Sequence, residues 1–422
     1  MKKFTLSILF LTITFFTYSQ DIILYGFLPS SPDTEFLRLA HFDPIFGNVV
    51  DEDSIYSATA YALGSSSFDA VQKAFIFIGA DTAWNFRLYT RAIRTKSTIS
   101  SPVFSETLND LQYDMNSMNT YGMGSYISDS TLIDTLNDFW EYQYATRFMQ
   151  IEQESGVLTE LNQMPDISAF PAGSSTFDAN NGRYIVNAYD TSFVERMVVI
   201  DAATGTVLSK EPIGLNAGDY LNNLEYNNED DKIYGFYRGS DNTYYALISI
   251  DINNEFEVDT IYTFTDLQYF FQGGAVFHQA SQSYIMFYID TTNTNRIAVI
   301  DVITGDLTAN PISNESISEI EVDNTEYALA KYHETVGILD ELNSNKEFVI
   351  YPNPISTGAS LHYQGKTVPE QIRIYNARGV LVDFHENLNQ NMTINTGEIK
   401  PGVYLISIQT KNRIETHKVL IR

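Results

Sequence analysis

The sequence contains no cysteine. Disulfide bonds, thiol nucleophiles and thiolate metal sites are therefore excluded, and the fold must be stabilised by its core alone. Basic residues are also scarce, because 25 Lys and Arg stand against 53 Asp and Glu, a formal net charge of −28. The acidic excess lies before residue 345, since residues 345–422 contain nine basic and six acidic residues. Such an acidic body repels nucleic acids and anionic membranes, so neither is an expected partner.

Recognised catalytic motifs are missing as well. The sequence has no H-E-x-x-H zinc motif, no P-loop, no G-x-S-x-G nucleophile elbow, no G-x-G-x-x-G dinucleotide motif and no sialidase-type S-x-D-x-G-x-T-W box. Paired carboxylates could still form a glycosidase site, but no local spacing selects a pair. The sequence therefore assigns no catalytic residue.

After residue 19, no apolar run is long enough to span a membrane as a helix. The N-terminus carries two lysines, then an apolar stretch at residues 4–16, then small residues at the −3 and −1 positions of a cut before Gln20. This three-part order predicts a secretory signal peptide over residues 1–19. The alternative is a buried first strand. No cysteine lies near the cut, which excludes a lipobox anchor.

Aromatic residues are abundant, with 28 Tyr and 27 Phe, and this favours β-rich structure. One pattern recurs six times: an apolar residue, usually followed by Asp or Asn, then a turn and an alternating apolar strand. The anchoring residues are Phe68, Tyr113, Phe177, Tyr226, Phe277 and Val322, at separations of 45, 64, 49, 51 and 45 residues. This spacing is typical of propeller blades. We therefore predict an all-β chain with a six-bladed β-propeller over residues 20–342, and seven blades as the alternative.

Two units continue with a third strand and a D-x-x-T-G turn, at Asp201–Gly205 and Asp301–Gly305, and Glu152–Gly156 is a relaxed version. The Asp side chain can cap the N–H groups of the turn, and the Gly supplies a positive φ. Each unit then has the four strands that a blade requires. A metal loop is the alternative, but hairpin chemistry accounts for the motif without a metal.

Closure of the ring is predicted from the two ends of the repeat. The first mature residues resemble the second to fourth strands of a blade that lacks a first strand. We expect strands around residues 36–42 to pair with strands around residues 322–332, which removes exposed sheet edges. The second unit carries an insertion around residues 127–144. The segment Tyr184–Gly205 resembles secreted propellers with Y-V-x-N … V-I-D-x-x-T-G units, and this resemblance implies a fold and no activity.

The C-terminal part differs from the repeat. After a linker at residues 343–348, residues 349–422 alternate apolar and polar residues and predict a small immunoglobulin-like β-sandwich. Three motifs occur in order: YPNP, IRIYNARGVLV and GEIKPGVYLISI, followed by a closing HKVLIR. Together they resemble the type A C-terminal sorting domain of the bacterial type IX secretion system. An ordinary accessory sandwich is the alternative.

This resemblance implies export across the outer membrane of a Bacteroidota-type bacterium, followed by removal of the domain and surface attachment or release. Its implied partners are the type IX secretion machinery and its sortase. The residues that carry the motifs are Tyr351, Pro352, Asn353, Pro354, Tyr375, Gly379, Gly402 and Tyr404.

Candidates for metal binding are few. His41, His278 and His333 lie on separate units of the repeat, and each is more typical of a strand or surface residue than of a ligand. The acidic loop Asn227–Lys232 offers oxygen ligands for calcium, but it lacks the alternating register of a strong calcium motif. A solvated β-turn is the preferred interpretation, and calcium is the only cofactor that the composition suggests.

Aromatic clusters and short triplets complete the candidates. The clusters are Trp84, Phe86 and Tyr89, and Phe139, Trp140, Tyr142 and Tyr144. They could form a carbohydrate or protein contact surface, although alternating aromatic residues in strands usually pack between blades. The D-[S/T]-apolar triplets that begin at Asp53, Asp81, Asp134 and Asp259 resemble O-glycosylation sites of secreted Bacteroidota proteins.

Two functions are compatible with these features. The first is a binding or adhesion module, secreted or displayed on the cell surface, that recognises a glycan or a protein. The second is an extracellular hydrolase with an active site on the propeller axis. The lack of a catalytic signature favours binding. The central channel distinguishes the two, because converging titratable side chains would favour the enzyme, whereas aromatic and amide side chains would favour binding.

Overall fold

A computed structural model describes residues 22–29, 36–70, 72–104, 108–134, 139–216, 218–325, 327, 348–351, 360–365, 367–376, 381–386, 389, 391–395, 399–400, 402–410 and 414–421. Contacts between Cα atoms divide the chain into two units, Met1–Ala330 and Lys331–Arg422. Every named element in the described residues is a β-strand. The predicted all-β class is therefore confirmed.

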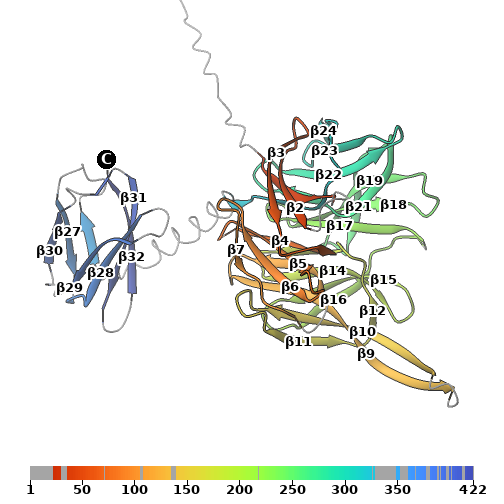
Figure 1. The fold of residues 1–422 in the computed structure, drawn as a ribbon, viewed down its shortest axis with the longest axis horizontal. Helices are drawn as coiled ribbons and strands as arrows, with labels where there is room; N and C mark the ends of the chain where they lie inside the picture. The colour runs from red at the N-terminus through yellow and green to blue at the C-terminus, as the bar shows by residue number, and fades with distance from the viewer. Residues whose placement is uncertain are drawn as a thin grey trace, which may run out of the picture. The chain divides into compact units, whose positions relative to one another are not determined.

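Six sheets form the first unit, and they are arranged as the blades of a β-propeller (Figure 1). Blade A contains β1 (Leu24–Leu28), β2 (Leu37–Asp43), β3 (Asn48–Ile55) and β25 (Ser318–Val322). Blade B contains β4 (Ala60–Asp69), β5 (Ala74–Ala80), β6 (Phe86–Ala92) and β7 (Ser97–Ser100). Blade C contains β8 (Leu108–Asp114), β9 (Asn119–Asp134), β10 (Phe139–Ile151) and β11 (Leu158–Met164).

The second half of the ring follows the same plan. Blade D contains β12 (Ile167–Ala169), β13 (Ser175–Asp178), β14 (Arg183–Asp190), β15 (Glu195–Asp201) and β16 (Val207–Pro212), and both β12 and β13 pair with β14. Blade E contains β17 (Tyr220–Asn227), β18 (Lys232–Arg238), β19 (Tyr245–Asp251) and β20 (Glu257–Phe264). Blade F contains β21 (Leu267–His278), β22 (Ser283–Asp290), β23 (Asn295–Asp301) and β24 (Asp306–Ala309). The prediction of six blades is confirmed.

Blade A closes the ring with strands from both ends of the first unit. β25 lies antiparallel to β1 and pairs Val322 with Leu24 and Glu321 with Tyr25. We predicted that the end of the repeat supplies the missing first strand of this blade, and that prediction is confirmed. The predicted partner of that strand, residues 36–42, is wrong. That stretch forms β2, one strand further out. The physical reason is burial, because β1 (LYGFL) is buried at every position, as the place beside an innermost strand requires.

Apolar and aromatic side chains fill the spaces between neighbouring blades. Between blades A and B, Phe27, Phe77 and Tyr89 are all fully buried. The Phe27 and Phe77 rings meet edge to face with centroids 4.9 Å apart, and Tyr89 stacks on Phe77 at 4.9 Å. The Tyr89 hydroxyl donates to the Ser57 carbonyl at 2.6 Å, which satisfies its polar end. Such packing on both faces explains why β5 (AFIFIGA) is apolar throughout.

The D-x-x-T-G turns form hairpins closed by their own groups, as predicted. The Thr204 N–H donates to Asp201 Oδ1 at 2.8 Å, and the Gly205 N–H donates to the Asp201 carbonyl at 2.8 Å. Gly205 has φ 73°, a left-handed conformation that glycine adopts without the steric cost of a Cβ. The Asp301 turn repeats this arrangement, with N–H groups of Ile303 and Thr304 on the carboxylate.

The innermost strands run in the same direction along the axis, as contacts between β17 and β21 illustrate. About midway along both strands, the Gly273 N–H donates to Asn223 Oδ1 at 2.9 Å. At their ends, the Asn228 N–H donates to Gln279 Oε1 at 3.1 Å. We call the face where the innermost strands begin the upper face, and the face where they end the lower face. Because strands alternate in direction, the turns between second and third strands also lie on the upper face.

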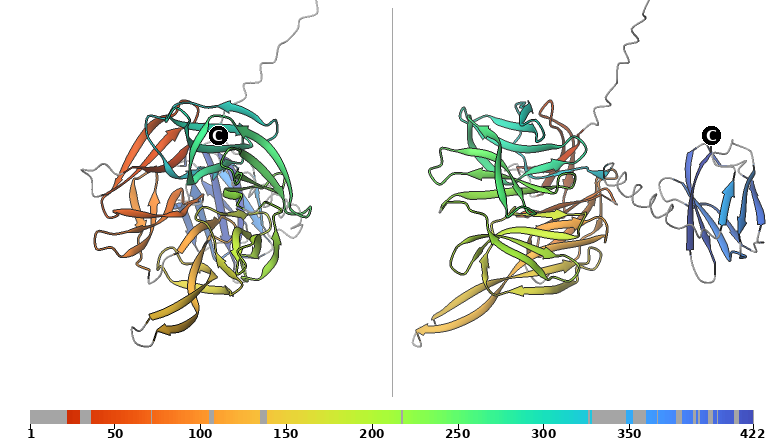
Figure 2. Two further views of the ribbon diagram at one scale, coloured as in Figure 1. Left: turned by 90° about the vertical axis from the view of Figure 1, so that its right-hand side faces the viewer. Right: turned by 180° about the vertical axis from the view of Figure 1, so that it is seen from behind.

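The predicted insertion is the hairpin of β9 and β10, which is longer than its equivalents and projects away from the ring (Figure 2). Its pairing runs from Ile151 opposite Thr120 to Phe139 opposite Asp134. The hairpin joins a second and a third strand, so it projects from the upper face.

The second unit contains two sheets. One sheet has the order β26 (Phe348–Tyr351), β27 (Ser360–Gly365) and β30 (Asn391–Asn395). The other has the order β29 (Leu381–Glu386), β28 (Gln371–Asn376), β31 (Gly402–Gln409) and β32 (Ile414–Ile421). Buried residues from both sheets, among them Leu361, Ile374 and Ile406, form one apolar cluster. Two sheets that share a core fit the predicted sandwich.

Candidate ligand-binding cleft

Six residues with a left-handed backbone conformation (positive φ), one from each blade, surround the axis near the upper face. We call these six residues the belt. Blades B, D and F contribute Gly64, Gly173 and Gly273, and blades A, C and E contribute Glu319, Asp110 and Asn223. Each acidic or amide side chain accepts a backbone N–H of the next blade. Glu319 bonds Gly64 at 2.8 Å, Asp110 bonds Ser174 at 2.7 Å, and Asn223 bonds Gly273 at 2.9 Å. The propeller is therefore built from three pairs of blades.

The pairing of blades is also present in the sequence, as a repeat whose period is two blades. LGSSSFD at residues 63–69 matches AGSSTFD at residues 172–178. LNDLQYD at residues 108–114 matches LNNLEYN at residues 221–227. Two innermost-strand motifs alternate from blade to blade. A repeat of about fifty residues does not distinguish them, so the alternation is visible only when every second blade is compared.

Four carboxyl groups line a cavity of about 40 Å³ on the axis: Asp110, Glu225, Glu319 and Glu321. Asp110 and Glu319 are fully buried, and burial raises the pKa of Asp110 to about 8 and that of Glu319 to about 7. Burial also raises the pKa of Glu321 to about 8 and that of Glu225 well above its usual value. These groups therefore hold protons in a range where ordinary carboxyl groups are ionised.

Most of these carboxyl oxygens have protein partners. Glu319 accepts N–H groups of Gly64 and Ser65, and Glu321 accepts the Ser66 hydroxyl at 2.8 Å. Asp110 Oδ2 is buried without a hydrogen-bond partner. Within the described residues, no group of three or more Asp, Glu or His side chains is arranged to hold a metal ion. The axial acids thus connect neighbouring blades.

Beside the axis, the upper face opens into a cleft of about 690 Å³. Its aromatic and amide lining consists of Tyr61, Tyr220, Tyr245, Tyr269, Phe270, Phe271, Gln268 and Gln272. Three cleft residues directly precede belt residues in the sequence. Leu63, Gln272 and Ser318 line the cleft, and the residues that follow them, Gly64, Gly273 and Glu319, belong to the belt. Blades A, B, E and F therefore meet here, and the rigid belt positions the cleft walls.

Polar contacts fix the walls of the cleft. The Gln272 amide donates to the Tyr220 hydroxyl at 2.6 Å, and the Tyr220 ring lies 5.9 Å from the Phe270 ring. The guanidinium carbon of Arg238 lies 4.9 Å from the centre of the Tyr220 ring. The Tyr61 hydroxyl lies 2.6 Å from the Ser318 hydroxyl. Tyr269 is 57% exposed, so an aromatic face is accessible to a ligand.

The predicted aromatic clusters divide between packing and surface. Tyr89 is fully buried between blades, whereas Trp84 and Tyr144 are exposed and Phe86 is 39% exposed. Phe139, Trp140 and Tyr142 belong to β10, but their side chains lie outside the description. The cleft residues were not predicted, because they come from separate blades and form no local cluster in the sequence.

Trp84 belongs to a second feature that repeats in alternate blades. The turns that begin at Asp81, Asp190 and Asp290 share the pattern D-T-x-x-x-x-R, and each aspartate accepts its arginine at 2.7 Å. The fourth residue of each turn is left-handed: Trp84 has φ 61°, Phe193 has φ 60° and Asn293 has φ 62°. Bulky residues rarely adopt this conformation. Trp84 and Phe193 are 73% and 80% exposed, so neither is held there by burial.

The predicted histidines do not come together. His41 lies in β2 with its ring 5.5 Å from Tyr25, and burial lowers its pKa. His278 ends β21, shares a hydrogen bond with the Ser281 hydroxyl at 2.7 Å, and also has a pKa lowered by burial. His333 lies outside the described residues. The two described histidines act as strand residues.

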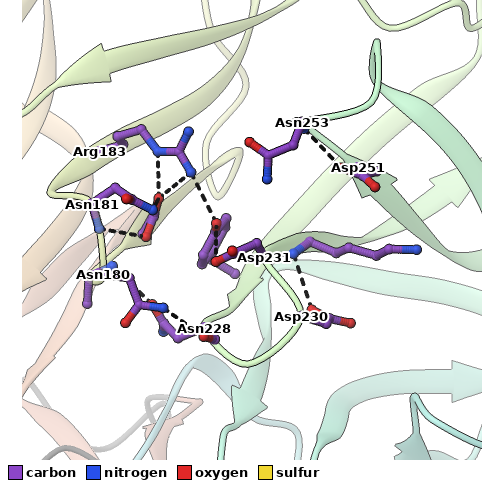
Figure 3. Close-up of polar contacts among 12 residues, drawn as sticks. Asn180, Asn181, Arg183, Asn228, Asp230, Asp231, Asp251 and Asn253 are labelled. Atoms are coloured by element: carbon purple, nitrogen blue, oxygen red, sulfur yellow. Dashed lines mark hydrogen bonds and ion pairs between the residues drawn. The ribbon is translucent and has the colours of Figure 1, made fainter. Parts of the chain in front are cut away.

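The acidic loop Asn227–Lys232 forms a turn between β17 and β18, with its side chains engaged by neighbours (Figure 3). Asp230 accepts the Tyr234 hydroxyl at 2.6 Å, and Asn228 Oδ1 accepts the Ala179 N–H at 3.1 Å. Arg183 bridges to the Tyr226 hydroxyl at 3.3 Å. These contacts agree with the preferred interpretation as a β-turn.

The triplets proposed for glycosylation stay a prediction. Asp53 accepts Arg91 at 2.7 Å and Asp81 accepts Arg87 at 2.7 Å, so both have structural roles. Asp259 lies in β20, 4.0 Å from Lys232, and Asp134 ends β9.

The sorting-motif residues fall on the strands of the second unit. Tyr351 ends β26, Tyr375 lies in β28, and Gly402 begins β31. Tyr404 is buried, and its hydroxyl donates to the Lys400 carbonyl at 2.7 Å. The other motif residues, Pro352, Asn353, Pro354 and Gly379, lie outside the described residues.

Comparison with known families agrees with this arrangement of the C-terminal unit. Residues 349–422 match the family described as secretion system C-terminal sorting domain. No curated protein matches the chain. The described residues include no helix that is long and apolar enough to cross a membrane. The match to the sorting domain shows that the protein is exported by the type IX secretion system and is secreted or located at the cell surface, with a propeller ahead of its sorting domain.

Solved structures resemble the propeller. TolB from Acinetobacter baumannii is 14% identical with a TM-score of 0.50, and the match covers 71% of this chain and 66% of that chain. PorZ from Porphyromonas gingivalis is 10% identical with a TM-score of 0.39, covering 96% and 58%. The Cps50 (Swd1) propeller from Myceliophteria thermophila is 10% identical with a TM-score of 0.41, covering 69% and 86%. At these identities the TolB match supports the fold alone.

Proposed function

We propose that this exported propeller is a binding module whose upper-face cleft recognises a glycan. The cleft carries the proposal, because aromatic rings and amide groups line a volume of about 690 Å³. Ligand sites of several hundred Å³ with an apolar lining and few polar groups are typical of small-molecule recognition. Aromatic faces stack on the apolar faces of sugar rings, and glutamine side chains can donate to and accept from hydroxyl groups.

Binding is favoured over the hydrolase alternative by the geometry of the axis. The axial cavity of about 40 Å³ has room for a water molecule but not for a sugar ring. Asp110 and Glu319 accept backbone N–H groups of neighbouring blades, which is a structural role.

One observation keeps the hydrolase as a second candidate. Glu225 and Glu321 are half-buried acids with raised pKa values, and they line both the axial cavity and a cavity of about 130 Å³ on the lower face. Such a pair could supply general acid–base chemistry. Release of reducing sugar from polysaccharides, lost in the Glu225→Gln and Glu321→Gln variants, would favour the hydrolase.

A glycan array tests the proposed function. The protein expressed from residue 20 to its C-terminus should bind a subset of the printed glycans. The Tyr269→Ala variant should lose most of that signal, because Tyr269 is the exposed aromatic residue of the cleft. Tyr56→Ala is the matched control, since Tyr56 is 72% exposed and does not line the cleft. An array without any bound glycan would refute the proposal.

A further inference from the structure

Arg238 differs from other arginines of the upper face. Arg87, Arg196 and Arg296 each donate to an aspartate at 2.7 Å. Arg238 makes no ion pair with any described carboxylate, and its Nε is buried without a hydrogen-bond partner. In a chain of net charge −28, a buried cationic donor without a carboxylate partner is an exception that needs an explanation.

Acids close to Arg238 have other partners. Asp241, three residues further along the chain, accepts the Thr243 N–H at 3.0 Å and the Thr243 hydroxyl at 2.7 Å. Asp219 accepts the Tyr237 hydroxyl at 2.7 Å and the Ser240 N–H at 3.0 Å. Glu195 accepts the Asn187 amide, and burial raises its pKa. Arg238 instead lies over the Tyr220 ring, 4.9 Å from its centre. The ring holds the guanidinium plane in place without neutralising its charge.

Among the residues that the structure describes, the lining of the cleft contains no acidic residue, and Arg238 is its single charged residue. A planar guanidinium matches a carboxylate or sulfate through two parallel hydrogen bonds. We propose that the cleft takes an anionic saccharide, with an acidic group of the sugar on the Arg238 guanidinium and its ring against the aromatic wall of Tyr220, Phe270 and Tyr269. This inference rests on the proposed glycan-binding function and specifies its ligand class.

The experiment compares acidic and neutral glycans on one array, with uronate-containing, sialylated and sulfated members and the carboxyl-reduced form of each uronate. The protein, the Arg238→Gln variant and the Arg238→Lys variant are applied at equal concentration. Arg196→Gln is the control, because Arg196 lies on the same face but is paired with Asp190 and does not line the cleft. Circular dichroism melts confirm that each variant is folded.

We expect binding to acidic glycans and not to their carboxyl-reduced forms. The Arg238→Gln variant should bind at least about tenfold more weakly, the loss typical of one hydrogen-bonded charge. The Arg238→Lys variant should recover part of this loss, since lysine keeps the positive charge but lacks the two parallel N–H donors of the guanidinium. The Arg196→Gln control should bind as the parent does. Uronates, sialic acids and sulfates are separate arms, so the array also identifies the acidic group.

Two outcomes overturn the inference, and they are distinguishable. Binding to neutral glycans that is unchanged in the Arg238→Gln variant would refute the anionic ligand but leave the proposed function intact. Absence of all binding would refute both.

Discussion

Replacement of Asp110 by asparagine tests how the axial carboxyl groups affect stability. Asp110 Oδ1 accepts the N–H groups of Ser174 and Ser175 at 2.7 and 3.1 Å, whereas Oδ2 has no partner. An asparagine can keep both accepted bonds with its carbonyl oxygen and place its amide nitrogen at the position of Oδ2. The variant therefore removes the ionisation of this group with little change in shape.

The sign of the effect follows from the raised pKa. Burial raises the pKa of Asp110 from 3.8 to about 8, so the folded state retains a proton that the unfolded state releases. Protonated Asp110 therefore stabilises the folded state. This stabilisation is complete below the pKa of the unfolded state, is lost as the pH rises towards the pKa of the folded state, and is absent above it. This displacement corresponds to roughly 6 kcal/mol, which is an upper limit because the neighbouring acids titrate together.

Urea unfolding at several pH values, followed by circular dichroism, measures this effect. At pH 3, below the unfolded pKa, the Asp110→Asn variant should match the parent, and at pH 9 it should be more stable by a few kcal/mol. Asp190→Asn is the control of opposite sign, because backbone N–H bonds and Arg196 lower the pKa of Asp190. That variant should lose stability at neutral pH. Equal stability of parent and Asp110→Asn variant at pH 9 would refute the reasoning.

Three further predictions concern the upper-face turns, ring closure and export. Phe193→Asn should raise the free energy of unfolding in urea by about 0.5–1 kcal/mol, because asparagine tolerates the left-handed conformation that Asn293 adopts in blade F; a loss of stability contradicts it. Deletion of residues 21–55 should cause aggregation in light scattering, since β25 loses its partner β1; a monomer that melts like the parent contradicts it. Mass spectrometry of the extracellular protein should find a C-terminus within residues 343–348, and an intact KVLIR end contradicts removal of the sorting domain.

The architecture could be predicted because each blade repeats the same local chemistry. The anchoring residue, the Asp or Asn after it and the D-x-x-T-G turn are local signals, so blade number and strand order followed from them. The partner of β25 could not be predicted correctly. Both β1 and β2 contain apolar residues, and only the burial of β1 at every position distinguishes it.

The site was harder to predict than the fold. Tyr220, Arg238 and Phe270 lie on three different strands of blades E and F, so no sequence window contains them together. The axial acids carried a weak signal, because Glu319 and Glu321 alternate with apolar residues in an innermost strand. In a strand buried on both faces, acids at alternate positions indicate a polar axis. The comparison of every second blade would have shown that Asp110 and Asn223 are equivalent.

The central claim is that the propeller binds its ligand in the upper-face cleft. Hydrogen exchange of the full-length protein, with and without a glycan selected on the array, tests it most directly. The account predicts slower exchange at residues 61–63 and 268–272, which line the cleft, and unchanged exchange at residues 402–410 of the sorting domain. Slower exchange confined to residues 349–422, or to the lower-face turns, would contradict it.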